Sequence, residues 1–254
     1  MLFRKLELDW RYAVGELFIV VAGVMIALAA DGWLKDRSDH ALEREYLVAL
    51  AADLASDTAE LSTNIALAAR RAELGHQVLL AMAGDKVLDP AYLAMAVERA
   101  MYFAYPAYSR STMSDLMSTG NLRLLRDQTL KRELSEYYRS IDQMEQWSGN
   151  WRKIQMDFEY YLPEVLDLEH RQSLVSSGAP MDGIASPYVQ LPWARDFEVT
   201  EREGEEILAR LRSHPEIRSR LEGMVRIQAM QFSYLTGVRS RAEETLGIVE
   251  AATR

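Results

Sequence analysis

The chain has no cysteine among its 254 residues. This absence excludes disulfide bonds, thiol nucleophiles and metal sites built on cysteine thiolates. It is compatible with an oxidising compartment without requiring one. Histidine is also scarce, with four residues at positions 40, 76, 170 and 214. The side chains that most often ligate metals or relay protons are therefore few and scattered.

Catalytic motifs are missing as well. The sequence contains no glycine-rich phosphate loop, no G-x-S-x-G and no H-E-x-x-H. Two segments, Glu73-x-x-His76 and Asp167-x-x-His170, place an acid three residues before a histidine, as di-iron bundles do. With 38 acidic residues in the chain, this spacing arises readily by chance. We predict a non-enzymatic protein with no catalytic residues, no metal ligands and no cofactor; a metal-carboxylate enzyme is the alternative.

Basic residues are outnumbered by acidic ones, 29 to 38, which gives a net charge of −9. The first 33 residues hold three basic and four acidic side chains, so the rest of the chain has 26 against 34 and a net charge of −8. No basic face stands out, which argues against nucleic acid as a partner. An acidic body also has little reason to lie flat on anionic lipid. This balance favours solubility and protein partners.

Strand patterns are nearly absent, and helical periodicity dominates. Apolar residues recur at steps of three, four or seven over residues 42–79, which predicts one helix of about twelve turns from an N-cap at Ser38 to Gly84. Asp57 interrupts this stripe where it narrows. Further helices are predicted at residues 90–105, 111–120, 129–162 and 215–252. The expected fold class is all-α, with a single N-terminal transmembrane helix followed by a bundle of long helices.

One long hydrophobic run lies near the N-terminus. Residues 17–30 carry no charge but are short for a bilayer, whereas residues 12–34 cover about 34 Å at ~1.5 Å per residue, enough for a ~30 Å hydrocarbon core. In this longer segment Glu16 and Asp31 lie near the two interfaces. We predict a transmembrane helix over residues 12–34. Its expected interface anchors are the aromatic residues at its ends, Trp10, Tyr12 and Trp33.

The predicted span divides the chain into a stub of residues 1–11 and a body of residues 35–254. Three basic residues precede the span and three follow it closely, so the positive-inside rule gives no clear orientation. A short stub before a long body is typical of a signal anchor, and we predict a cytoplasmic stub and an extracytoplasmic body. Two alternatives stay open. One is cleavage near Ala27-Leu28-Ala29, which resembles an A-x-A site, with release of the body; the other is a cytoplasmic body.

One side of the predicted span is rich in small residues. Gly15, Gly23 and Ala27 lie on one face, and Ile19 lies between them. Such a face lets another helix approach closely in lipid. Glu16 lies beside it, and an acid at this depth costs on the order of a few kcal/mol unless it snorkels, is protonated or meets a partner. We predict contact with other transmembrane helices, from a second copy or a complex subunit. The alternative is ordinary membrane-helix composition with a snorkelling Glu16.

Two blocks of the chain carry a resemblance to a known family. The first comprises Tyr12-Ala13-Val14-Gly15-Glu16, Val20-Val21, Gly23, Ile26-Ala27-Leu28 and Trp33. The second comprises residues 115–122 (DLMSTGNL), Leu130 and Tyr137-Tyr138. These blocks resemble a family of bacterial membrane-anchored proteins catalogued as a domain of unknown function. Where that family usually has asparagines before the tryptophan, this chain has Ala29-Ala30-Asp31-Gly32. The resemblance implies one retained N-terminal span and no assigned activity. Together with the extracytoplasmic body predicted from the signal-anchor pattern, this gives an expected location in the bacterial inner membrane with a periplasmic body.

Aromatic residues gather on the helix predicted at 129–162, where Trp147 and Trp151 belong to the apolar stripe. Such a stripe is more often core than a ligand site. Residues 171–199 form the one clear irregular stretch, and long loops in compact domains are often functional. Its apolar members Tyr188 and Trp193 indicate that part of it packs down or docks. We predict a possible pocket or docking surface at these four aromatic residues.

Two functions from different classes follow. The first is a non-enzymatic interaction or scaffold protein, an accessory subunit of a membrane complex or a homo-oligomer, whose partners are the bilayer and other transmembrane helices. The second is an extracytoplasmic ligand-binding sensor bundle. Because the stub of residues 1–11 is too short for an output domain, a sensor would have to act through a membrane partner.

Overall fold

The computed structural model describes residues 10–103, 105–176 and 197–253. These residues are mostly helical and include no strand, which confirms the all-α fold class. In chain order the elements are α1 (Trp10–Ala83), α2 (Pro90–Arg99), α3 (Ser111–Ser118), the 3₁₀ turn η1 (Asn121–Leu124), α4 (Gln128–Val165), α5 (Leu168–Ser176), α6 (Glu201–Ser213) and α7 (Pro215–Thr253).

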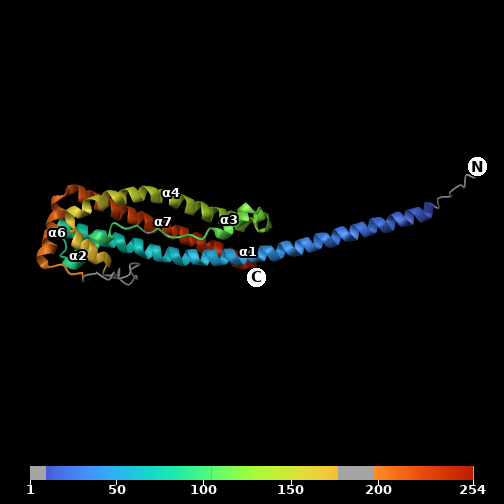
Figure 1. The fold of residues 1–254 in the computed structure, drawn as a ribbon, viewed down its shortest axis with the longest axis horizontal. Coiled ribbons are helices and arrows are strands. Elements are labelled where there is room, and N and C mark those ends of the chain that lie inside the picture. The colour runs from blue at the N-terminus through green and yellow to red at the C-terminus, as the bar shows by residue number, and fades with distance from the viewer. Residues whose placement is uncertain (1–9, 104, 177–196, 254) are drawn as a thin grey trace, which may run out of the picture.

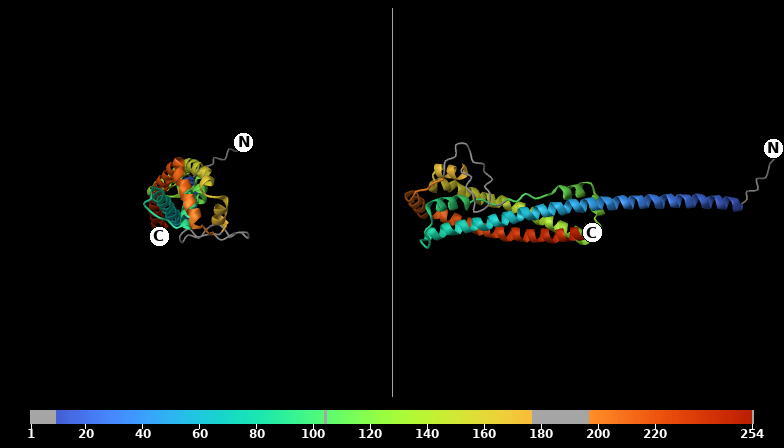
Figure 2. Two further views of the ribbon diagram at one scale, coloured as in Figure 1. Left: turned by 90° about the vertical axis from the view of Figure 1, so that its left-hand side faces the viewer. Right: turned by 90° about the horizontal axis from the view of Figure 1, so that it is seen from below.

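The longest helix, α1, extends well beyond the body of the molecule (Figure 1). Its N-terminal part, residues 10–34 (the free half), projects alone. Its C-terminal part, residues 35–83 (the packed half), joins α4 and α7 in an elongated bundle (Figure 2). The helix α4 runs in the same direction as α1, and α7 returns in the opposite direction. The described C-terminus therefore lies at the end of the bundle from which the free half of α1 emerges, and α2 and α6 lie at the far end.

The core is built from one apolar stripe of each long helix. The helix α7 is central, because it packs extensively along α1 and also against α4. Burying one leucine side chain completely in this core stabilises the fold by about 1.5–3 kcal/mol relative to leaving it exposed. The buried residues include Leu50, Leu54 and Leu61 on α1, Leu134, Ile141 and Phe158 on α4, and Leu221, Leu235 and Val249 on α7.

A non-helical segment joins α2 to α3 and bridges α1 and α4. The chain between α2 and α3 runs back along the bundle as an extended segment (Figure 2). Ser109 in this segment donates its backbone N–H to Asp57 Oδ1 of α1 at 2.8 Å and accepts a hydrogen bond from the Tyr138 hydroxyl of α4 at 3.2 Å. The segment therefore satisfies polar groups of both helices.

Helix ends follow their capping residues. The Asp89 carboxylate accepts from the Tyr92 N–H, just before Pro90 at the first helical position of α2. Thr200 and Glu203 form a capping box at the start of α6, and the hydrogen bonds from Thr200 lower the pKa of the Glu203 carboxyl. After α3, Gly120 has φ = 72°, a left-handed conformation that suits glycine and stops the helix.

Three predicted boundaries are wrong. The helix expected to begin at Ser38 does not begin there, because α1 continues unbroken through this position. The helix expected over 90–105 ends at Arg99, and the aromatic run after it is extended. The stretch expected to be irregular from 171 onward begins in a helix instead, because α5 continues to Ser176; residues 177–196 lie outside the described residues. The predicted C-terminal helix over 215–252 is confirmed by α7.

Candidate membrane helix and bundle groove

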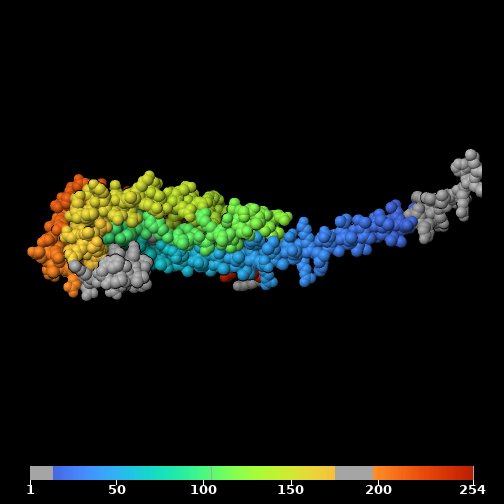
Figure 3. Space-filling model, viewed as in Figure 1, coloured from blue at the N-terminus to red at the C-terminus, as the bar shows by residue number. Residues whose placement is uncertain are grey.

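The free half of α1 is apolar around most of its circumference, and none of its residues from Val14 to Leu34 is buried by the described part of the chain. Its most hydrophobic stretch has none of its residues buried, and the helix is long and apolar enough to cross a membrane. Leu28 is 67% exposed, whereas Leu54 in the packed half is fully buried. Soluble proteins rarely expose large continuous apolar surfaces of this kind. The space-filling view shows this half as a bare rod beside the thicker bundle (Figure 3).

The five residues predicted to contact another membrane helix all lie on this free half. Gly15, Glu16, Ile19, Gly23 and Ala27 are exposed. A Cβ atom added to Gly15 or Gly23 would meet no atom within 4 Å, so no described residue of this chain covers the face. The contact with a partner helix stays a prediction, and the face is available for it.

The expected interface anchors lie at the two ends of the free half. Trp33 is 61% exposed, and the guanidinium of Arg37 lies 5.6 Å from the centre of its ring. This pairing places a cation and an aromatic ring together, as membrane interfaces favour. Trp10 and Tyr12 lie in the first turns of α1, where only the backbone is described.

The bundle begins directly beyond the predicted span. The Arg126 guanidinium, just before α4, lies 2.7 Å from the Asp36 carboxylate of α1. The backbone N–H of Arg126 also donates to Glu43 Oε1 at 2.8 Å. The predicted span ends at Leu34, so these contacts leave no flexible linker between the apolar half and the folded body.

A groove lies between α4 and α7, about halfway along the bundle. It has a volume of about 600 Å³ and is open to solvent along one side. Its lining includes two of the four predicted docking residues, Trp147 and Trp151, and the other two, Tyr188 and Trp193, lie outside the described residues. The remaining wall is formed by residues of both helices, among them Gln143, Met230, Ser233, Gly237 and Val238.

Aromatic contacts give the groove its floor. The rings of Trp147 and Tyr234 lie with centroids 4.9 Å apart, and Trp147 keeps 45% of its surface exposed. Trp151 is buried and stacks on Phe103 with centroids 6.1 Å apart. The Tyr234 hydroxyl donates to the Ser140 carbonyl at 2.7 Å, and burial raises the pKa of this hydroxyl. These contacts hold the rings of Trp147, Trp151 and Tyr234 in place.

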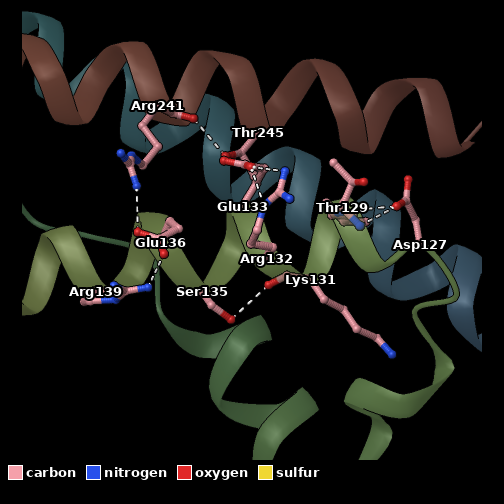
Figure 4. A network of polar contacts seen from close by, with 11 residues as sticks. Asp127, Thr129, Lys131, Arg132, Glu133, Ser135, Glu136, Arg139, Arg241 and Thr245 are labelled. Carbon is pink, nitrogen blue, oxygen red and sulfur yellow. Dashed lines mark hydrogen bonds and ion pairs between the residues drawn. The ribbon is translucent and has the colours of Figure 1, made fainter.

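The charged end of the groove contains two guanidinium groups and one carboxylate. Glu136 Oε2 lies 3.1 Å from Arg241 Nη1, and Glu136 Oε1 accepts from the Arg139 guanidinium (Figure 4). Arg241 comes from α7, whereas the other two residues come from α4. These are the charged side chains that line the groove, so its local charge is +1 in a chain whose net charge is −9.

The α7 side of the groove is not predicted by the sequence. The aromatic stripe of α4 is a local pattern, but the pairing of Tyr234 and Arg241 with it joins two distant helices and leaves no local pattern. The spacing of Met230, Tyr234, Gly237 and Arg241 on α7 follows a helical face, and this spacing is the one usable signal.

A buried carboxylate lies deeper in the bundle. Asp57 is almost fully buried and accepts hydrogen bonds from the Ser109 N–H at 2.8 Å and the Tyr137 hydroxyl at 2.6 Å. Burial and the Asp57 hydrogen bond raise the pKa of Tyr137, and burial raises the pKa of Tyr108 and Tyr138. These partners explain how an acid can interrupt the apolar stripe of α1.

The two acid-x-x-His motifs do not form a common site in the described residues, where no group of three or more acids and histidines could hold a metal. Glu73 and His76 are exposed on α1. His170 is buried, and its Nε2 atom lies 3.7 Å from the Glu203 carboxylate. The His170 motif therefore joins α5 to the start of α6.

Comparisons with known proteins give no match to a family model, a curated protein or a solved structure. The family resemblance of the two sequence blocks thus stays a prediction.

Proposed function

We propose that this protein is a non-enzymatic, membrane-anchored interaction or scaffold protein, either an accessory subunit of a membrane complex or a homo-oligomer. The observation that carries the proposal is the free half of α1, which is apolar, unburied and continuous with the bundle. In lipid this half is stable, whereas in water it would expose a continuous apolar surface. The family resemblance of the N-terminal block supports the same anchorage.

In the proposed arrangement the protein crosses the bacterial inner membrane once, with residues 1–11 in the cytoplasm and the bundle in the periplasm. The absence of cysteine provides a direct test, because a single introduced cysteine is the sole thiol. Ser240→Cys lies at an exposed position on α7, and Glu7→Cys lies in the stub. A membrane-impermeant maleimide applied to cells with a permeabilised outer membrane should label Ser240→Cys but not Glu7→Cys. The reverse pattern would place the bundle in the cytoplasm.

The proposed partner surface is the small-residue face of the span. Gly15 and Gly23 would let a second helix approach closely, and Glu16 beside them would gain a partner or a shared proton. The partner is a transmembrane helix, from a second copy or from another subunit. Lipid covers the remaining faces of the span.

The native mass of the full-length protein in mild detergent tests this surface. We expect a species heavier than one 28.9 kDa chain. Glu16→Leu and Gly23→Leu should each reduce it to one chain with the helical content unchanged. Val21→Leu is the matched control, since Val21 lies about 160° round the helix from Gly23. An uncleaved wild-type monomer without adducts would overturn the proposal, and a mass shortened by the first ~30 residues would indicate cleavage.

The second candidate function is a ligand-binding sensor bundle that acts through a membrane partner. The specific observation in its favour is the groove between α4 and α7, with aromatic walls and a charged end. The unbroken helix α1 would carry a change in the bundle to the span. Binding to the groove, rather than native mass, tests this candidate.

A further inference from the structure

We propose that the groove between α4 and α7 binds a flat aromatic anion, such as an aryl carboxylate or an aryl sulfonate. This inference rests on the sensor candidate, whose ligand class it names, and it does not depend on the scaffold function. Three properties of the groove support it: its size, its aromatic floor and its local charge.

The size of the groove suits a small molecule. Its volume of about 600 Å³ falls within the range of about 300–1,000 Å³ that is typical of ligand pockets. Gly237 lies in the α7 wall, and a Cβ atom added there would meet nothing within 4 Å. A larger residue at this position would extend into the groove, so glycine keeps the space open.

The floor of the groove suits a flat ring. Trp147 has nearly half of its surface exposed, although Tyr234 packs against its indole ring. Trp151 beside it is held by Phe103. An aromatic ligand on Trp147 would form an offset or edge-to-face contact worth about 0.5–1.5 kcal/mol beyond the area it buries. Because both tryptophans are held by neighbouring rings, little side-chain entropy remains to be lost on binding.

The charge of the groove selects an anion. Arg139 and Arg241 share the single carboxylate of Glu136, which leaves one positive charge unbalanced among the lining residues (Figure 4). Arg241 is only partly exposed, and its planar guanidinium can donate to a carboxylate or a sulfonate through two parallel N–H groups. The acidic remainder of the protein repels anions, so this end of the groove is a local exception.

The test measures binding to the full-length protein in lipid nanodiscs by titration calorimetry, with empty nanodiscs subtracted. The probes share one ring system: naphthalene-2-sulfonate is the anion, and 2-naphthalenemethanol is the neutral analogue. We expect saturable binding of one sulfonate per chain, at least tenfold tighter than that of the alcohol. Equal affinity of the two probes would overturn the assignment of an anion.

Two substitutions of the same kind locate the site. Gly237→Leu fills the groove and should weaken sulfonate binding at least tenfold. Gly247→Leu is the matched control, because Gly247 lies exposed on the same helix with no atom within 4 Å of an added Cβ. It should bind as the wild type does. Unchanged binding by Gly237→Leu, or equal loss in both variants, would overturn the assignment to the groove.

A third variant isolates the charge. Arg241→Gln removes the unbalanced cation and should weaken sulfonate binding about five- to tenfold while leaving binding of the neutral alcohol unchanged. Thermal unfolding should show that no variant is less stable than the wild type; the two glycine variants should gain similar helix stability. Equal weakening of both probes would mean that Arg241 acts through the shape of the groove, which would overturn the role of its charge. Monomeric native mass with intact sulfonate binding would refute the scaffold function and leave this inference standing.

Discussion

The free half of α1, residues 10–34, and the packed half, residues 35–83, are both rich in apolar residues and have opposite fates. In the free half the apolar residues surround the helix, and from Val14 to Leu34 all of them except the half-buried Ala22 are exposed. In the C-terminal half they form a stripe that α7 covers, with charged residues on the other side. A one-sided stripe suits packing against protein, whereas apolar side chains on all sides are typical of a helix that crosses a membrane.

The largest expected difference between the halves comes from one substitution made in each. Leu54→Ala removes a fully buried side chain and should lower the free energy of unfolding by about 2–5 kcal/mol. Leu28→Ala makes the same chemical change on the free half and should alter the stability of the bundle by less than about 0.5 kcal/mol. Urea unfolding of both variants in detergent, followed by circular dichroism, measures the difference. Equal losses would show that the two halves are packed alike.

A smaller loss of stability is expected at Asp57, the buried acid that interrupts the apolar stripe of the packed half. Tyr137→Phe removes a hydrogen bond from the buried carboxylate of Asp57 and should lower the free energy of unfolding by about 1–3 kcal/mol. Tyr160→Phe is the control, because Tyr160 is exposed on the same helix. A loss as small as that of the control would mean that water replaces the hydroxyl.

The pH dependence of stability gives a second test of the contact between Tyr137 and Asp57. The pKa of Tyr137 is raised in the folded state, so the fold favours the protonated hydroxyl. Its contribution is fully present below the pKa of about 10 of an unfolded tyrosine and is lost as pH rises above that value. The slope is about 1.4 kcal/mol per pH unit for each such tyrosine. Tyr137→Phe should flatten the alkaline limb of urea midpoints measured from pH 8 to 11.

Matched glycines offer a comparable test of packing. A Cβ atom added to Gly75 would lie 2.6 Å from Val225 Cγ2, so Gly75→Ala forces α1 and α7 apart. Overpacking costs about 1–3 kcal/mol and the helix propensity of alanine returns about 1 kcal/mol, so we expect a net loss of about 1 kcal/mol. Gly23→Ala on the free half meets no atom and should leave the urea midpoint of the bundle unchanged. A stabilised Gly75→Ala would contradict the close approach.

The smallest effect is expected at the junction of the two halves. Arg126→Gln removes an ion pair with the solvent-exposed Asp36 and a longer one with Glu43, whose side chain is 14% exposed. Such pairs are worth up to about 1 kcal/mol and are weakened by salt. The difference in urea midpoint between the variant and the wild type should therefore shrink from low to high ionic strength. A difference that is independent of salt would mean that Arg126 acts through packing.

The sequence predicts the long helices because their stripes are local patterns. The stripe of α7 extends from Ile217 to Val249, and the prediction of this helix is confirmed within one residue. The predicted start at Ser38 fails for a physical reason. Serine caps a helix only where the preceding residues leave the helical conformation, and no glycine or proline lies between Trp33 and Leu42 to make them do so.

Only the α4 wall of the groove could be predicted from the sequence. Trp147 and Trp151 belong to one helix and share a visible stripe, so the aromatic wall follows from the sequence. The opposite wall depends on the register between α4 and α7, which the helix-to-helix packing sets and no short-range pattern reports. The shared carboxylate of Glu136 has the same origin, since its two arginines are three and 105 residues away.

Because α1 is unbroken, the tilt of the proposed span would set the position of the far end of the bundle. In the proposed anchorage the 49 residues from Lys35 to Ala83 would hold the far end of the bundle about 74 Å above the bilayer, at ~1.5 Å per residue. A change of about 10° in the tilt of the span would swing that end sideways by about 13 Å. A small rearrangement among membrane helices would thus become a movement of the α2 and α6 end as wide as a helix.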